Sequence, residues 1–521
     1  MMNRLCLPSF LQQSQPLLRR QYNRLFGQFL RFRMREIERM RRTPIALQEK
    51  VRRTILSTAS STEWGKRYAL HELRTAAAFA ERLPLQYYDE LKPAIERMML
   101  GEKDVLWPGR VRYFSRSSGT TSDRSKYLPV SRQNLRRCHT KGSWDAITLF
   151  YHHRPDARQF AGKTLLMGGS MAPYPAYPKT LRGDVSAFMI RYMPLIAHPF
   201  VAPDIATMLL PDFEEKLERI ARALLREPDL VMIGGVPTWT VVLFRRLLEL
   251  SGKAHILELL PNLQGYVHGG VSFRPYREQF ARFLPSEKIS YQEIYNASEG
   301  FFAVQDIPGE EGLLLLLNNG VYYEFLPPEE WHQTHPQAVP LEAVELGRTY
   351  ELVITTNAGL WRYRLGDTVC FTSVKPYRIK ITGRTQQFIN TFGEEVMVDN
   401  TDEALAYACN LTGAQVIDYS VAPVYLGDRS RGGHEWLVEF SRPPLDAEHF
   451  ALLLDEKLRA INSDYDAKRH LDMALTRLCL RPVPEGTFHR WLKAKGKFGG
   501  QHKVPRLAND RRYLEDILAT L

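Results

Sequence analysis

Apolar and polar residues change their spacing several times along the chain, and each change predicts a different kind of element. Before residue 100 the apolar residues recur mainly at helical intervals. An apolar, β-prone run at 111–114 then predicts a strand, and extended structure resumes at 127–130 after a loop rich in hydroxyl side chains. The first part of the chain is therefore predicted to be helical, and its first strand pair flanks a polar loop.

Further along, short strand-like runs alternate with amphipathic helical runs. Strands are predicted at 164–167, 230–233 and 289–294, and helices at 213–225 and 240–250. This alternation favours α/β layering with parallel strands. A later β-rich section is predicted from runs at 313–317, 321–325 and 350–355, with Asn318-Asn319-Gly320 as a hairpin turn.

From about Arg384 the pattern restarts as a smaller unit. Helices are predicted at 401–410 and 447–461, strands at 415–422, 435–440 and 475–480, and a basic tail at the end. We therefore expect an α/β protein with a large multi-layer N-terminal domain of mixed sheets and helices (1–383) and a small mobile α+β C-terminal domain (384–521). The change of composition places the hinge near 384–388.

Length and composition narrow the class of protein. With 521 residues and 44 % apolar content, the chain can bury a large core. Its five cysteines are scattered and form no C-x-x-C pair, which disfavours a disulfide framework or a zinc site and favours a reducing compartment. No apolar run is long enough to span a membrane, and we expect a soluble, cytoplasmic monomer.

The positive charge is concentrated at one end of the chain. The formal net charge is +12, and residues 1–53 hold thirteen Lys/Arg against three Glu, which is 13 − 3 = +10. Within 1–55, Leu25, Phe29, Phe32, Ile37 and Met40 recur at helical spacing among arginines. We interpret this segment as a basic amphipathic helix docked on the main domain. Contact with an anionic membrane or a nucleic acid is the alternative, and we expect no nucleic-acid partner.

The hydroxyl-rich loop is the first candidate for chemistry. It contains Ser117, Ser118, Gly119, Thr120, Thr121 and Ser122, followed by Lys126. Backbone at a glycine, several hydroxyl donors and a cation suit the phosphates of ATP. The Walker spacing G-x-x-x-x-G-K-[ST] is absent. On its own, a loop of this composition is more often a plain turn.

Two further motifs carry carboxylates. In Tyr295-Asn296-Ala297-Ser298-Glu299-Gly300, a tyrosine can stack on a purine, and Glu299 can hold Mg²⁺ against phosphate oxygens. Farther along, Asp367 beside Gly366 is suited to accept hydrogen bonds from a ribose diol. Solvated turns are the competing interpretation of each motif.

A glycine-rich basic loop near the C-terminus is the fourth candidate. It runs through 496–506 and contains Lys503, which can carry positive charge toward a reacting phosphate. The alternative is a solvated basic tail.

Together and in this order, the motifs resemble the adenylate-forming superfamily, and within it the plant auxin-responsive Gretchen Hagen family of acyl-acid amido synthetases and its bacterial relatives. The resemblance covers about 80–510 and is carried by 117–121, Tyr295-x-Ala-Ser298-Glu299, Tyr322-Tyr323-Glu324-Phe325-Leu326-Pro327, Tyr363-Arg364-Leu365-Gly366-Asp367, Gly383-Arg384-Thr385 and Gln501-His502-Lys503-Val504-Pro505-Arg506. Two features depart from the family. Thr120-Thr121-Ser122-Asp123 stands where a second glycine is common, and the plant proteins are longer.

The resemblance implies a reaction with ATP and Mg²⁺ in which a carboxylic acid becomes acyl-AMP and an amine, usually an amino acid, then displaces AMP. It implies that 117–122 hold phosphates, Tyr295 packs on adenine and Ser298 lies in the nucleotide site. It further implies that Glu299 binds Mg²⁺, Asp367 binds ribose, and Lys503 with Arg384 supports the adenylate. The acyl pocket would lie near Trp239, Gly269 and Gly270.

Two other functions stay open. An acyl-CoA ligase would share the first half-reaction and differ in the acceptor. A non-catalytic protein that binds nucleotide or membrane is the second alternative, and the joint presence of Glu299, Asp367 and Lys503 argues against it. No G-x-S-x-G elbow and no activated cysteine setting is present, which disfavours a covalent acyl-enzyme.

Overall fold

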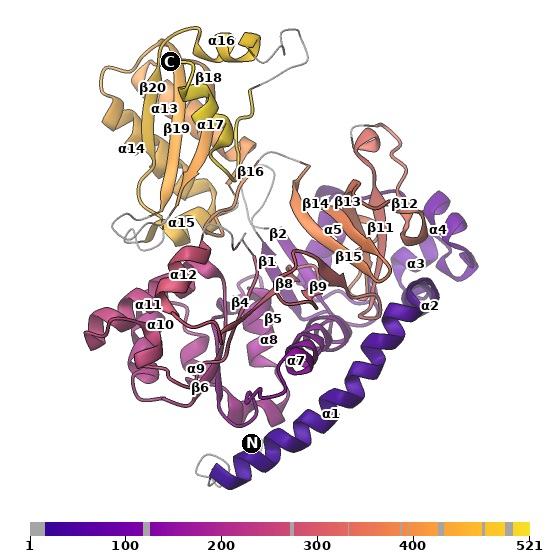
Figure 1. Ribbon diagram of the computed structural model, residues 1–521. Coiled ribbons are helices and arrows are strands. Elements are labelled where there is room, and N and C mark those ends of the chain that lie inside the picture. The colour runs from indigo at the N-terminus through magenta and orange to yellow at the C-terminus, as the bar shows by residue number, and fades with distance from the viewer. Residues whose placement is uncertain are drawn as a thin grey trace.

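Helices make up the first part of the structure, as the spacing predicts. The computed structural model describes residues 16–117, 126–270, 273, 276–331, 333–385, 388–394, 396–425, 432–470, 475–494 and 504–521. The long helix α1 runs along one side of the molecule (Figure 1), and Pro44 begins the next helix at a position where a missing N–H costs nothing. The elements are α1 (Pro16–Arg42), α2 (Pro44–Ala59), α3 (Glu63–Arg67), η2 (Leu70–Glu72), α4 (Ala76–Arg82) and α5 (Tyr88–Met99).

A four-stranded sheet with the order β2-β1-β5-β4 follows. Its strand β1 starts two residues later than predicted and pairs antiparallel with β2, so that Ser117 lies opposite Lys126. The elements of this region are β1 (Tyr113–Ser117), β2 (Lys126–Val130), α6 (Arg132–Asn134), the π-helical η3 (Leu135–Thr140), α7 (Lys141–His153), β4 (Met171–Tyr174), β5 (Tyr177–Gly183), α8 (Val185–Arg191), η4 (Leu195–Phe200) and α9 (Ile205–Met208).

The predicted parallel strands form one end of an eleven-stranded sheet. β3, β6, β7 and β8 pair in parallel in that order, with helices between successive strands, so the α/β layering is confirmed. The elements are β3 (Lys163–Leu166), α10 (Phe213–Leu224), β6 (Leu230–Gly234), α11 (Pro237–Ser251), η5 (Ile256–Glu258), β7 (Gly265–His268), α12 (Arg277–Phe283) and β8 (Ser290–Asn296).

The rest of this sheet is antiparallel and contains one correction. The predicted hairpin at Asn318-Asn319-Gly320 is wrong, because β10 pairs with β9 and β15 while β11 pairs with β12 and β13. Gly320 does make a turn, with φ of +79°. That local conformation does not decide which strands pair. The strands and turns are β9 (Phe301–Gln305), β10 (Leu313–Leu315), β11 (Val321–Leu326), η7 (Pro328–Glu330), β12 (Val339–Pro340), η8 (Leu341–Ala343), β13 (Thr349–Thr356), β14 (Tyr363–Val374) and β15 (Tyr377–Arg384).

The C-terminal elements gather at one end of the molecule (Figure 1) around the sheet β18-β19-β20. Alternate residues of β19 face opposite ways, with Trp436 packed among residues of α13 and α14 and Leu437 among residues of α16 and α17. The last strand lies later than predicted, and the predicted tail contains two helices. The elements are β16 (Phe388–Ile389), β17 (Val396–Met397), α13 (Val398–Thr412), β18 (Gln415–Val424), β19 (Gly433–Arg442), α14 (Ala447–Ile461), α15 (Ser463–Arg469), β20 (Cys479–Val483), α16 (Thr487–Ala494) and α17 (Arg512–Leu518).

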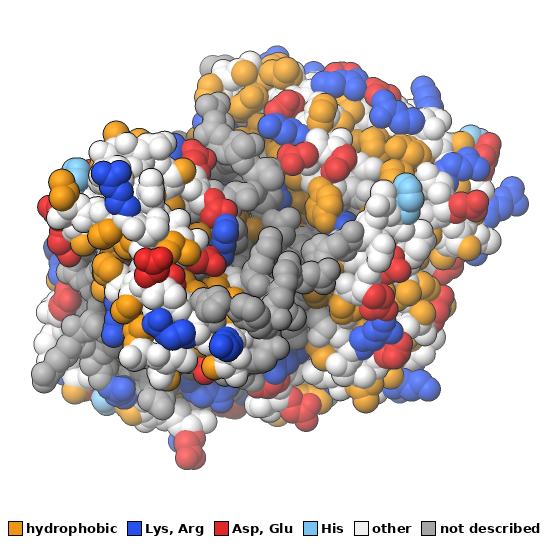
Figure 2. Space-filling view, turned by 90° about the horizontal axis from the view of Figure 1, so that it is seen from above, with side chains coloured by type: hydrophobic (Ala, Val, Ile, Leu, Met, Phe, Trp, Pro, Cys, Tyr) orange, Lys and Arg blue, Asp and Glu red, His pale blue; other side chains and the backbone are white. Residues whose placement is uncertain are grey.

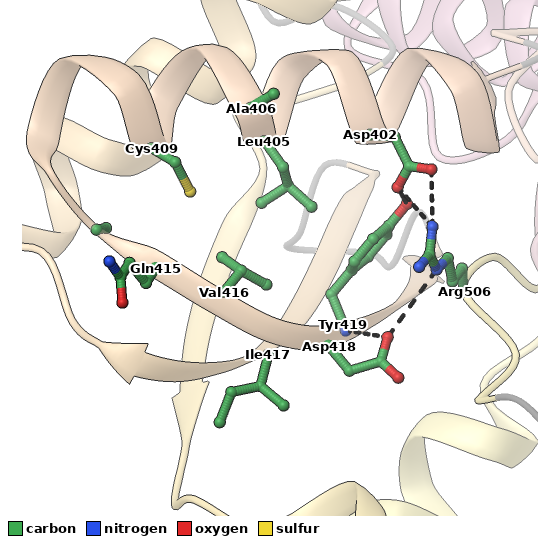
Figure 3. Close-up of a pocket in the computed structure, with 11 residues that line it drawn as sticks. Asp402, Leu405, Ala406, Cys409, Gln415, Val416, Ile417, Asp418, Tyr419 and Arg506 are labelled. Carbon is green, nitrogen blue, oxygen red and sulfur yellow. Dashed lines mark hydrogen bonds and ion pairs between the residues drawn. The ribbon is translucent and has the colours of Figure 1, made fainter.

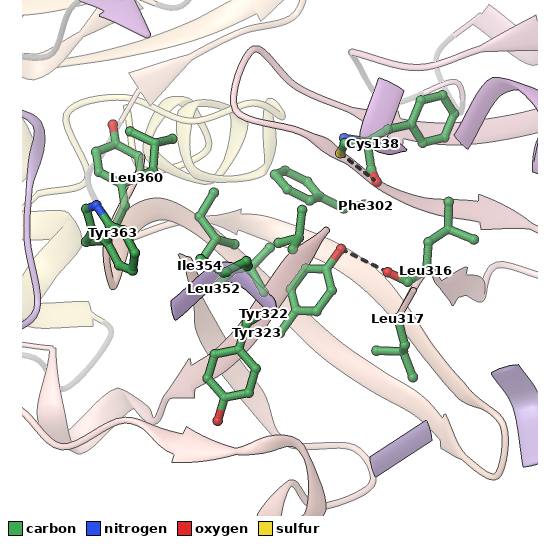
Figure 4. Close-up of a cluster of buried hydrophobic side chains, with 14 of the residues drawn as sticks. Cys138, Phe302, Leu316, Leu317, Tyr322, Tyr323, Leu352, Ile354, Leu360 and Tyr363 are labelled. Carbon is green, nitrogen blue, oxygen red and sulfur yellow. Dashed lines mark hydrogen bonds between the residues drawn. The ribbon is translucent and has the colours of Figure 1, made fainter. Parts of the chain in front are cut away.

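The largest core cluster joins the N-terminal helices to the antiparallel part of the sheet. Figure 4 shows Tyr323 at its centre, donating a hydrogen bond from its hydroxyl to the carbonyl of Leu316 near Phe302. On the face seen in Figure 2, the described basic and acidic side chains are interspersed. Among the described helices, none combines the length and the apolar character needed to cross a bilayer.

Candidate functional site

Two of the predicted motifs meet through one hydrogen bond. The hydroxyl of Tyr295, at the end of β8, donates to Oδ2 of Asp367 on β14 at 2.5 Å. Both side chains are buried. Asp367 also lies opposite Arg384 in the pairing of β14 with β15, which brings the start of the predicted hinge to the same place. The structure thus joins motifs that are far apart in the sequence.

The hydroxyl-rich loop begins beside the same motif. The hydroxyls of Ser115 and Ser298 lie 2.9 Å apart, and Ser115 is two residues before Ser117 on β1. Ser118, Gly119, Thr120, Thr121 and Ser122 lie outside the described residues. The loop they belong to joins two paired strands, because Ser117 and Lys126 are opposite one another. Lys126 places its Nζ 5.6 Å from the ring centre of Tyr88.

Glu299 follows Ser298 directly and is partly exposed. Among the described residues, no group of three or more His, Cys, Asp or Glu side chains could hold a metal ion. Mg²⁺ at nucleotide sites typically takes only one or two carboxylates and completes its shell with phosphate oxygens and water. A single carboxylate directly after Ser298, which contacts the strand that leads into the hydroxyl-rich loop, therefore fits Mg²⁺ that arrives with ATP, and Glu299 as its ligand remains a prediction.

The predicted acyl-pocket residues lie at the carboxyl ends of the parallel strands, where α/β proteins commonly bind ligands. A Cβ at Gly269 would lie 2.4 Å from the carbonyl oxygen of Ile294, so only glycine permits this approach to β8. Gly270 has φ of +82° and lies against Val236, the residue that precedes α11. The first turn of α11 carries Trp239.

Trp239 contacts both parts of the chain. Its ring lies 4.0 Å from that of Phe213, and the Nζ of Lys468, on α15 of the C-terminal part, lies 4.8 Å from the Trp239 ring centre. The place of Trp239 in an acyl pocket stays a prediction.

Lys503 lies outside the described residues, but the chain directly after it is anchored (Figure 3). Arg506 makes two hydrogen bonds to the carboxylate of Asp402, at 2.8 and 2.7 Å, and stacks over the ring of Tyr419. The backbone of Val421 donates to the carbonyl of Arg506, and Ser420 donates to that of Pro505. The C-terminal end of the Lys503 loop is therefore held on β18.

The structure also identifies residues that the sequence did not. His139, in η3, places Nδ1 3.0 Å from Oδ1 of Asn296, the residue after Tyr295. Complete burial lowers the pKa of His139 to about 4, so the ring is neutral at pH 7. Burial likewise raises the pKa of the neighbouring Cys138 thiol to about 12, which excludes it as a nucleophile at pH 7. A single histidine without a motif offers no sequence signal.

Two arginines next to Asp367 have structural partners. Arg362 makes a two-pronged ion pair with Glu324, and Arg364 does so with Glu351. All four side chains are buried. Arg362 also donates to the carbonyls of Ala80 and Leu83. These buried ion pairs thus join β11, β13 and β14, and Arg362 ties them to the helical region, which orients the strand that carries Asp367.

Comparisons with known proteins agree with this arrangement. Indole-3-acetic acid-amido synthetase GH3.3 of Arabidopsis thaliana is 26 % identical over 557 residues, covering 91 % of each chain. Among solved structures, the GH3.15 acyl acid amido synthetase matches with a TM-score of 0.58 at 17 % identity, covering 91 % of this chain and 93 % of that one. A 2-hydroxyisobutyryl-CoA ligase matches with a TM-score of 0.56 at 13 % identity, covering 91 % and 92 %. The two structural matches show that the chain shares the fold of these two proteins.

Family models extend the agreement along most of the chain. The model of the GH3 family N-terminal domain matches residues 33–249, that of the central domain matches 314–384, and that of the C-terminal domain matches 399–512. Because all three parts occur in this order and the relatives align along nearly their full length, the chain belongs to the GH3 family.

Proposed function

We propose that this chain is an ATP-dependent acyl-acid amido synthetase. The observation that carries the proposal is the hydrogen bond from Tyr295 to Asp367, which brings the residue predicted to bind adenine next to the residue predicted to bind ribose. The relatives that align along most of the chain are amido synthetases. The Ser115–Ser298 contact adds the start of the predicted phosphate loop to the same place.

In the first half-reaction a carboxylate oxygen of the acid attacks the α-phosphorus of ATP. A new phosphorus–oxygen bond forms as the bond to pyrophosphate breaks. In the second, an amine attacks the acyl carbon, the carbon–nitrogen bond forms, AMP leaves and the nitrogen loses a proton. Neither step needs a nucleophilic side chain, so the protein contributes orientation and electrostatic stabilisation.

The side chains take the following parts in this proposal. Residues 117–122 and Lys126 hold the phosphates, Tyr295 and Asp367 hold the adenosine, with Ser298 beside them, and Lys503 with Arg384 stabilises charge at the α-phosphate. Glu299 would hold Mg²⁺, which neutralises phosphate charge when bound. Trp239, Gly269 and Gly270 border the acyl group.

The same proposal extends to the organisation of the chain. In this proposal the chain divides at 383/384, and the C-terminal part moves between the half-reactions about a hinge near 384–388, of which residues 386 and 387 lie outside the described residues. The protein acts as a monomer in the cytoplasm, where ATP and amino acids are available. Its described cysteines are all free, as a reducing compartment requires.

The fold does not distinguish an amine acceptor from CoA, because an amido synthetase structure and a CoA ligase structure match almost equally well, with TM-scores of 0.58 and 0.56. The sequence relatives favour the amine. Relatives that align along about nine-tenths of the chain are indole-3-acetic acid-amido synthetases, and the three matching family models all belong to the GH3 family.

An acceptor screen tests the proposal. Purified protein is given ATP, Mg²⁺ and a panel of carboxylic acids, with either a mixture of amino acids or CoA, and AMP and the acyl product are quantified. We expect AMP and an amide with amino acids. A thioester with CoA and no amide would make the protein a CoA ligase, and no AMP or pyrophosphate exchange with any acid would favour the non-catalytic alternative.

A pair of variants shows whether the activity belongs to this site. Glu299→Gln should abolish acid-dependent exchange of labelled pyrophosphate into ATP, because the carboxylate proposed for Mg²⁺ is lost. Glu485→Gln, at an exposed position before α16, is the matched control and should retain full exchange. An unchanged rate of pyrophosphate exchange in Glu299→Gln would exclude Glu299 as the ligand of Mg²⁺.

A further inference from the structure

One face of α1 is firmly docked on the protein. Leu30, Ile37 and Met40 are buried, and the helix packs on α7. Two arginines of this face reach buried carboxylates, with Arg33 paired to Asp145 and Arg41 to Asp306. The expected docking of this basic amphipathic helix on the main domain is confirmed for Pro16–Arg42, and these contacts fix which face of α1 points outward.

The outward face carries an apolar stripe. Leu25, Phe29 and Phe32 are spaced four and three residues apart, so they lie along one line of the helix. Their exposed fractions are 61, 46 and 67 %. Phe29 also packs edge-on against Trp144 of α7, so Leu25 and Phe32 are the most exposed members of the stripe. An exposed apolar patch rimmed by polar side chains marks an interaction surface.

A basic stripe runs beside the apolar one. Arg24, Arg31, Arg35 and Arg42 are exposed and recur at helical spacing, with Arg20 one turn before them. No described carboxylate lies within ion-pair distance of these five side chains, and Arg35 lies over the ring of Phe32 at 5.8 Å. No Asp or Glu occurs in the sequence before Glu36. The outward face of α1 therefore has one sign of charge over most of its length.

We propose that the outward face of α1 binds the surface of an anionic membrane. Apolar side chains flanked by arginines match a headgroup boundary, where the rings enter the acyl region and the guanidinium groups meet lipid phosphates. A nucleic acid would use the basic stripe but leave Leu25, Phe29 and Phe32 in water. A second copy of this chain would place two basic stripes together, which like-charge repulsion opposes. An anionic lipid surface would bury the apolar stripe and pair its phosphates with the basic stripe.

Vesicle co-sedimentation of the full chain tests this inference. We expect binding to phosphatidylcholine vesicles that contain phosphatidylglycerol, weak binding to phosphatidylcholine alone, and loss of binding as salt is raised. Equal binding to both vesicle types, or none to either, would overturn the proposal.

Two double variants assign the binding to the stripes. Leu25→Ser with Phe32→Ser should weaken partitioning by roughly tenfold or more, and Arg31→Gln with Arg35→Gln by roughly tenfold or more. Leu445→Ser and Arg512→Gln, exposed positions in the C-terminal part, are the matched controls and should leave it unchanged. All variants are checked for an unaltered melting temperature, because the substituted side chains are exposed.

Two further measurements separate the rival occupants. Sedimentation velocity that reveals a dimer dissociated by Phe32→Ser would assign the face to self-association. Binding of a labelled DNA duplex that Arg31→Gln with Arg35→Gln removes, without vesicle binding, would assign it to nucleic acid. Either result contradicts the membrane proposal, and neither depends on the enzyme's activity.

Discussion

The phenol of Tyr295 donates its hydrogen bond to the carboxylate of Asp367, across 72 residues of sequence. A hydrogen bond to a charged group in a buried setting is among the stronger ones that proteins make. It fixes the orientation of Asp367 and, through Asp367, the part of the proposed site that would hold ribose. This relationship gives the first prediction.

Tyr295→Phe should lower kcat/KM for ATP in pyrophosphate exchange by about tenfold or more, because Asp367 loses its orienting donor. Tyr323→Phe is the matched control, since it removes a hydroxyl whose partner is a core carbonyl. It should cost about 1 kcal/mol of stability and leave KM for ATP unchanged. Similar losses of kcat/KM in both variants would mean that the Tyr295 hydroxyl supports the packing of the core and has no specific effect on the ATP site.

Lys503→Ala should slow adenylation by about a hundredfold while changing ATP affinity much less, because the lost charge acts mainly where charge develops. Single-turnover formation of acyl-AMP and equilibrium ATP binding measure the two effects. Lys493→Ala, an exposed lysine at the end of α16, is the control and should behave as the wild type. Equal adenylation rates for all three proteins would exclude the role of Lys503.

Arg362→Ala should destabilise the fold by about 3–5 kcal/mol, because it leaves the buried carboxylate of Glu324 without its partner. Arg97→Ala also removes ion pairs, with Glu63 and Glu102, but these lie on the surface and should contribute less than about 1 kcal/mol. Denaturant unfolding compares the two variants. Equal stability of Arg362→Ala and the wild type would contradict the structural role.

Stability should fall on acidification below neutral pH. Burial lowers the pKa of His139 to about 4 and that of His268 to about 3 in the folded chain, below the ordinary value of 6.5. Between those values the unfolded chain binds more protons, so the stability contributed by each neutral ring is present above pH 6.5 and is lost as pH falls toward the folded pKa.

For His139 the expected loss is about 3 kcal/mol between pH 7 and pH 4. Urea unfolding at several pH values measures it. His139→Gln, which carries no titrating group, should flatten this part of the pH dependence, and an unchanged slope in that variant would show that His139 is not the responsible group.

Local patterns in the sequence determined most of the elements. Helix α14 occupies the predicted residues 447–461, and β6 and α10 end within one residue of their predicted bounds. These segments were predictable because each carries its own periodicity, and the alternation of strands and helices was enough to indicate the parallel sheet.

The order of the candidate motifs was likewise present in the sequence, but the sequence did not show that their side chains contact one another in the folded protein. Only the tertiary structure places Tyr295 on Asp367 and Ser115 on Ser298, assigns β10 and β11 to different neighbours, and buries His139 beside Asn296. Strand pairing and burial depend on contacts between distant residues. Which strands pair and which side chains are buried is decided by how segments distant in the sequence pack together, and a local sequence pattern does not contain that information.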